Sequence, residues 1–173
     1  LDLPDSHLAI QAAPGRRPVL IGDFTLKGNA STRLSLGGLL LDGALRLQGP
    51  LHAVTLRHCS VVPSKSGIAH TGTGTDLSLS LYRCLSGPVK TNRPLAAVML
   101  RDSLIDGENI AVDVDDSPLT VIASTLFGTT AAGRLEASNS LFDEQVIIAR
   151  RQEGCVRYSY LPAKSTTPRR HRC

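Results

Sequence analysis

The amino-acid sequence predicts an all-β protein, a right-handed parallel β-helix (a solenoid) of about seven or eight coils. Three observations support this fold class. Apolar stretches are short, mostly alternate with period two, and end at Gly, Pro, Asp or Asn. Gly or Pro interrupts nearly every window of helical length. One short pattern returns about every 20 residues, which is within the range of solenoid repeats.

The strands are expected wherever these apolar stretches occur. Each is too short for a stable helix and is bounded by residues that favour turns. In chain order the stretches are RLSLGGLLLDG (33–43), ALRLQG (44–49), AVTLRHCSVV (53–62), DLSLSLYRC (76–84), AAVMLRDSLIDG (96–107), NIAVDV (109–114), LTVIASTLFG (119–128) and RLEASNSLF (134–142).

The recurring pattern is visible when the chain is aligned on Ser103-Leu104-Ile105-Asp106. Its first position holds small or medium residues, and the position three residues earlier is apolar in all six copies. The first position holds Leu39, Cys59, Cys84, Ser103, Thr125 and Ser140, and the earlier one Leu36, Leu56, Leu81, Leu100, Ile122 and Ala137.

Stacked coils explain why such columns arise. One coil cannot bury its apolar side alone, whereas stacking pairs its backbone and continues the core. We therefore expect a structural ladder of Leu36, Leu56, Leu81, Leu100, Ile122, Cys59, Cys84 and Ser103. A sandwich or propeller is the competing interpretation, but the Asn-Gly turns of tight hairpins are missing.

Composition fits one ordinary domain and excludes several classes. The 173 residues are 42% hydrophobic and 3% aromatic, with a net charge of +4 that comes from a basic C-terminal tail. This weak charge argues against a nucleic-acid partner. No apolar run is long enough to span a membrane. We expect a β-helix domain over 1–149 and a terminal strand with a basic segment over 150–173.

From about Ser31 to Phe142, these columns resemble the repeats of the right-handed parallel β-helix superfamily, the architecture of pectate lyases and of many tail-fibre and adhesin domains. The segment RRQEGCVRYSYLPAKSTTPRRHRC resembles part of large bacterial proteins associated with phage-tail-like gene clusters. That resemblance implies a longer parent chain that continues beyond Cys173, in an exported protein or a particle. It carries over no catalytic residue.

The candidate catalytic residues are the acids of VDVDD, namely Asp113, Asp115 and Asp116. Clustered acids could cleave a polysaccharide by general acid/base chemistry or by holding a metal. However, Gly-His-Gly, Arg-Ile-Lys and Arg-x-Pro-x-x-Arg are all absent. The same stretch suits a strand that runs into an Asp/Ser/Pro turn.

The sequence predicts neither a cofactor nor a metal site. The five histidines lack zinc spacing, and TGTGTDLSL resembles a calcium repeat but occurs once. Cys59 and Cys84 share a column, so a disulfide between them is sterically allowed, although two buried thiols are the preferred interpretation. A pairing of Cys155 with Cys173 also stays open.

The sequence thus favours a non-enzymatic structural module of a larger bacterial protein or assembly. Its expected partners are other domains of the parent chain or assembly subunits. A domain that binds or cleaves polysaccharide along one face is the alternative.

Overall fold

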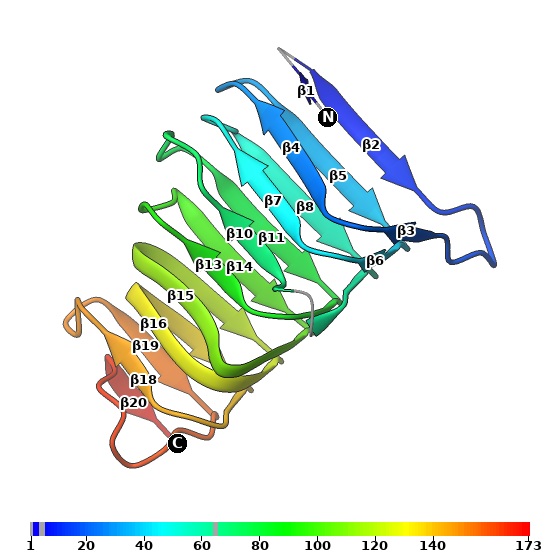
Figure 1. Cartoon of the computed structure of the whole chain (residues 1–173). Helices are drawn as coiled ribbons and strands as arrows, with labels where there is room; N and C mark the ends of the chain where they lie inside the picture. Colours follow the sequence, from blue (N-terminus) through cyan, green and yellow to red (C-terminus); the bar gives the residue numbers. More distant parts are fainter. Residues whose placement is uncertain (1, 4–5, 64–65) are drawn as a thin grey trace.

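The computed structural model describes residues 2–3, 6–63 and 66–173; the side chain of Asp115 also lies outside the described part. The chain winds into a parallel β-solenoid of about seven turns (Figure 1). Every strand pairing is parallel, which confirms the predicted stacking and excludes the antiparallel hairpins of a sandwich or propeller. The described residues include no helix, and so none that could cross a membrane.

Three parallel ladders run the length of the solenoid, and the chain visits them in the order A, B, C. Ladder A carries the longest regular strands. Its members are β2 (His7–Gln11), β5 (Arg33–Gly37), β8 (Ala53–Arg57), β11 (Ser78–Tyr82), β14 (Ala97–Arg101), the last parts of β15 (Leu104–Ile122) and β16 (Thr125–Ser138), β19 (Gly154–Arg157) and β20 (Arg169–His171).

Ladders B and C close each coil with shorter strands. Ladder B holds β3 (Val19–Ile21), β6 (Leu40–Asp42), β9 (Ser60–Val61), β12 (Leu85–Ser86), the first parts of β15 and β16, and β17 (Leu141–Phe142). Ladder C holds β1 (Asp2–Leu3), β4 (Phe24–Gly28), β7 (Leu45–Gln48), β10 (Ile68–His70), β13 (Val89–Thr91), the middle parts of β15 and β16, and β18 (Val146–Ile148).

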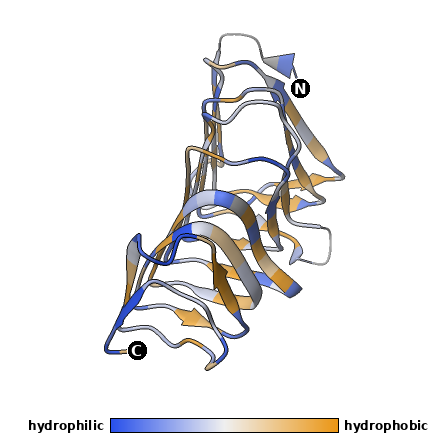
Figure 2. Cartoon of the chain, turned by 90° about the vertical axis from the view of Figure 1, so that its left-hand side faces the viewer, coloured by the Kyte–Doolittle hydropathy of each residue, from blue (hydrophilic) through white to orange (hydrophobic). Residues whose placement is uncertain are grey.

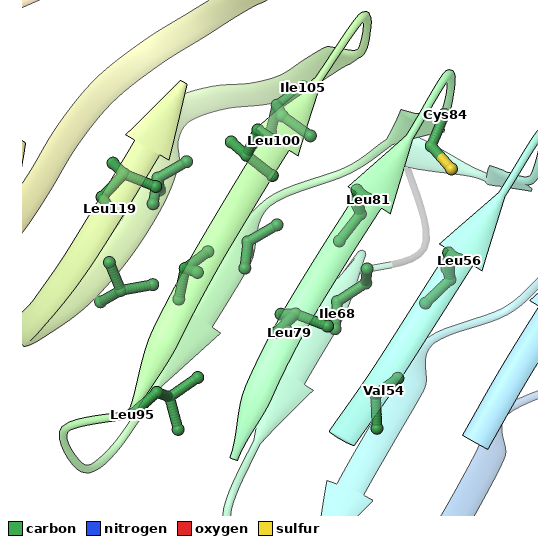
Figure 3. Packing of buried hydrophobic residues seen from close by; sticks show 14 of the residues in the cluster. Val54, Leu56, Ile68, Leu79, Leu81, Cys84, Leu95, Leu100, Ile105 and Leu119 are labelled. Carbon is green, nitrogen blue, oxygen red and sulfur yellow. The ribbon is translucent and has the colours of Figure 1, made fainter. Parts of the chain in front are cut away.

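An aliphatic core fills the space between the ladders. Along each ladder A strand, alternate residues point inward and meet the equivalent residues of the next coil, as Figure 3 shows for Leu56, Leu81 and Leu100. These leucines are fully buried, and burying one such side chain contributes about 1.5–3 kcal/mol. Figure 2 shows that hydrophobic residues recur from coil to coil along the whole chain.

The register corrects one expected ladder position. Leu36, Leu56, Leu81 and Leu100 lie in one column, but the next member is Val121 and not Ile122. Ile122 pairs with Arg101 and faces outward, half-buried. The sequence alignment is shifted by one residue in this coil because Ser124 and Thr125 are adjacent small polar residues. Ser124, and not Thr125, is the structural equivalent of Ser103.

The stacking of strands continues beyond residue 149. Strand β19 pairs with β16, and β20 pairs with β19. In β20 the inward column that holds Val156 ends in Arg170, whose guanidinium donates to the Ser165 carbonyl and to Thr167 Oγ1. The basic segment therefore packs as a polar last coil.

Candidate functional site

The corner between ladders A and B has the same backbone in coil after coil. One residue there adopts a left-handed conformation, which is uncommon for residues other than glycine. Its N–H donates to a carbonyl of the next coil, as Arg83 does to Arg101 and Asp102 to Ile122. These corner residues are Gly38, His58, Arg83, Asp102, Ala123, Asn139, Tyr158 and Arg172, with φ between 48° and 71°.

The residue after each corner forms a hydrogen-bonded column that we call the corner column. Ser103 Oγ accepts the N–H of Cys84 at 3.1 Å and donates to the Arg101 carbonyl at 2.8 Å. Ser124 Oγ does the same for the Ser103 N–H and the Ile122 carbonyl, and Ser140 and Ser159 repeat the bond to the preceding coil. Each of these four serines thus satisfies a buried backbone donor of the coil before it. The column comprises Leu39, Cys59, Cys84, Ser103, Ser124, Ser140, Ser159 and Cys173.

All four cysteines are free thiols, so the structure contains neither disulfide that the sequence left open. Cys59 and Cys84 are buried in the corner column, and each thiol donates to a carbonyl two residues earlier. Burial raises the pKa of both thiols, and that of Cys84 reaches about 11. Both are therefore protonated and unreactive at neutral pH. Cys155 is buried in β19, whereas Cys173 is exposed.

The acids proposed for catalysis all belong to β15. Asp113 is in the ladder C part of the strand, where it pairs in register with Lys90 and Ala131. Asp116 is in the following turn with φ 54°, and its carboxylate accepts a hydrogen bond from Arg150. The side chain of Asp115 lies outside the described residues. Among the described side chains, no group of three His, Cys, Asp or Glu is placed to hold a metal ion.

His70 is buried on the inner side of ladder C, where neighbouring coils place Leu47 and Thr91. Within the described part of the chain, neither ring nitrogen forms a hydrogen bond of good geometry. Desolvation lowers the pKa of His70, and the nearby Gly49 carbonyl offsets this only in part. His70 is therefore neutral in the folded protein at neutral pH.

A hollow with basic walls lies over the corner of the middle coils. We call it the basic hollow; its lining residues are Arg57, His58, Tyr82, Arg83, Arg101 and Asp102. Arg57 stacks on the Tyr82 ring with its guanidinium carbon 4.5 Å from the ring centre. Asp102 Oδ2 lies 3.9 Å from Arg83 Nε and 3.8 Å from Arg101 Nε.

A second hollow, which we call the apolar hollow, adjoins the first. It lies beside the connection from β2 to β3, which projects from the body of the solenoid in Figure 1. Gly38 keeps it open, since a Cβ there would come within 3.0 Å of Ala12 Cβ. Its walls include Ala9, Ala12, Ala13, Arg16, Gly37 and Gly38, and it shares Arg57 and His58 with the basic hollow.

Sequence reasoning missed both hollows. Their arginines occupy positions 16, 57, 83 and 101, which are spread through unrelated stretches of the chain. The register of the repeats could have revealed the basic hollow, because Arg57, Tyr82 and Arg101 occupy one outward-facing column on three successive coils. Comparisons of this chain with protein-family models, with curated proteins and with solved structures found no match.

Proposed function

We propose that this chain is a rigid, non-enzymatic structural module that works as part of a larger bacterial protein or assembly. The observation that carries the proposal is the continuity of its inter-coil bonding. The apolar column from Leu36 to Ala137 runs without a break, and the corner column adds buried hydrogen bonds between coils. Such bonding suits a spacer that keeps its shape.

The first coil of the solenoid supports the same role. Among the described residues, strand β2 pairs with β5 alone, and the first coil leaves Leu8, Leu20 and Phe24 only partly buried. Ile21 is 85% exposed. An unpaired strand edge beside apolar side chains is a surface on which another element can stack. We propose other domains of a longer parent chain, or assembly subunits, as these elements.

We further infer that the solenoid is right-handed and distantly related to the pectate-lyase-like superfamily. Parallel crossovers within one sheet are right-handed in about 98% of cases, and the three-ladder coil with a one-residue corner agrees with the repeat resemblance. An experimental structure in which the coils wind to the left would refute this inference.

Hydrogen exchange and a substrate screen together test the structural role. We expect ladder amides from β5 to β19 to exchange slowly and together, as in one cooperative unit. We also expect no product from acidic or neutral polysaccharides. Turnover that disappears in Asp113→Ala or Asp116→Ala would overturn the proposal and support the polysaccharide-cleaving alternative.

A further inference from the structure

We propose that the basic and apolar hollows together bind an extended acidic peptide segment that carries one aliphatic side chain. Acidic side chains of the segment would pair with the arginines, and its aliphatic side chain would enter the apolar hollow. The inference rests on the proposed structural role, because it gives the chemistry of a protein partner for the module.

The charge of the basic hollow is unbalanced. Asp102 is the one acid among the described residues that line the two hollows, against Arg16, Arg57, Arg83 and Arg101. The Arg83 and Arg101 side chains remain 68% and 55% exposed, and both approach Asp102 only at long distance. Their remaining N–H donors face solvent, where a carboxylate can accept two of them at once.

The spacing of the basic residues suits an extended chain. Arg57, Tyr82 and Arg101 lie on successive coils, so the two arginines are about 10 Å apart at the strand spacing of the solenoid. Alternate side chains of an extended peptide repeat at about 7 Å. The flexible arginine stems cover this difference, so acids two residues apart can each meet a guanidinium.

The apolar hollow identifies the remaining part of the ligand. It has a volume of about 300 Å³, and its apolar walls come from alanine and glycine residues together with Ile10 and Leu36, so one aliphatic side chain can enter it. Arg57 and His58 line both hollows. A ligand that fills both must therefore present an apolar group directly beside an anionic one, as an acidic peptide with a leucine does.

Other polyanions use these features less completely. Single-stranded nucleic acids bind through several stacking aromatics, whereas the basic hollow offers Tyr82, one face of which Arg57 covers. A uniformly charged polysaccharide has no group for the apolar hollow. Both ligand classes therefore serve as outcomes of the test.

The test measures fluorescence anisotropy of a labelled Asp-Glu-Asp-Leu-Asp-Glu-Asp peptide with the whole chain. We expect saturable binding that weakens as salt is added. Replacing the peptide leucine by serine should weaken binding about tenfold through loss of apolar burial. The paired substitution Arg83→Glu and Arg101→Glu should weaken it by at least about tenfold through charge reversal. Arg33→Glu, a charge reversal at an exposed residue of ladder A outside both hollows, should leave it unchanged.

Four results would overturn the inference: no saturable binding, equal binding of the leucine and serine peptides, equal loss in Arg33→Glu and the paired variant, or tighter binding of heparin or oligo-deoxythymidine than of the peptide. The last result would assign the surface to another polyanion. The serine peptide tests the unaltered protein, so misfolding of a variant cannot hide the answer. None of these results requires polysaccharide turnover, so the structural role can stand or fall separately.

Discussion

Replacing Ser124 by alanine tests the corner column directly. Ser124 Oγ accepts the Ser103 N–H at 3.1 Å and donates to the Ile122 carbonyl at 2.8 Å. The Ile122 carbonyl also accepts a hydrogen bond from the Asp102 N–H at 3.0 Å, and the substitution leaves this bond in place. The substitution therefore removes the acceptor of one buried donor, the Ser103 N–H, while the carbonyl stays paired.

The expected loss follows from the burial of that donor. Ser103 is 5% exposed and Ser124 is 3% exposed, so water cannot replace the lost acceptor. An unsatisfied buried donor costs about 1–3 kcal/mol, and we expect a loss of about 2 kcal/mol in the free energy of unfolding. Ser124→Cys should lose less, because thiols already occupy this column at Cys59 and Cys84.

Urea unfolding followed by circular dichroism measures this difference. Ser80→Ala is the matched control, since Ser80 lies in the outward column of β11 and is half-buried. The control should change the unfolding free energy by less than about 0.5 kcal/mol. If Ser124→Ala is as stable as Ser80→Ala, and the Ser103 amide exchanges no faster, the corner column does not stabilise the fold through this hydrogen bond.

Three further predictions concern the core, the buried histidine and the thiols. Leu81→Ala should lower the unfolding free energy by about 3 kcal/mol. Leu85 is 39% exposed, so Leu85→Ala should lower it by less than about 1 kcal/mol. Equal losses in urea titrations would contradict the burial of Leu81 in the core. The pKa of His70 is lowered in the folded state, so the unfolded chain binds more protons and stability should fall as pH drops from about 7 to about 5.5. His70→Leu should flatten this part of the pH profile, and an unchanged slope would refute the assignment. At pH 8, iodoacetamide should alkylate exposed Cys173 long before Cys84, whose pKa is about 11. If mass spectrometry showed the reverse order, Cys84 would not be buried in the corner column.

The repeat columns were predictable because solenoid stacking places equivalent residues of successive coils side by side. Spacing alone put Leu56, Leu81 and Leu100 in one column, since each coil carries one apolar residue at the same distance from its corner. The prediction was wrong at Ile122, where two adjacent small polar residues allowed two alignments. The left-handed conformation of Ala123 marks the corner of this coil and so fixes its alignment. An alanine in the sequence does not indicate such a conformation.

The surface was far less predictable than the core. Asp113 lies in the ladder C part of β15 and Asp116 at the corner that follows it, where its carboxylate accepts a hydrogen bond from Arg150. Nothing in the sequence indicates this partner, which lies 34 residues away. Arg57 and Arg101 are far apart in sequence and meet at one hollow. Outward columns tolerate most residue types, so only the register of the whole solenoid reveals which of them face one another.

The corner column has a consequence for the order in which the chain folds. The side chain that satisfies each buried N–H belongs to the next coil, 16 to 21 residues later. At a synthesis rate of about 5–20 residues per second, that acceptor emerges about one to four seconds after the donor. At these four corners, the buried N–H of a nascent chain therefore lacks its side-chain acceptor until the serine of the following coil has been synthesised.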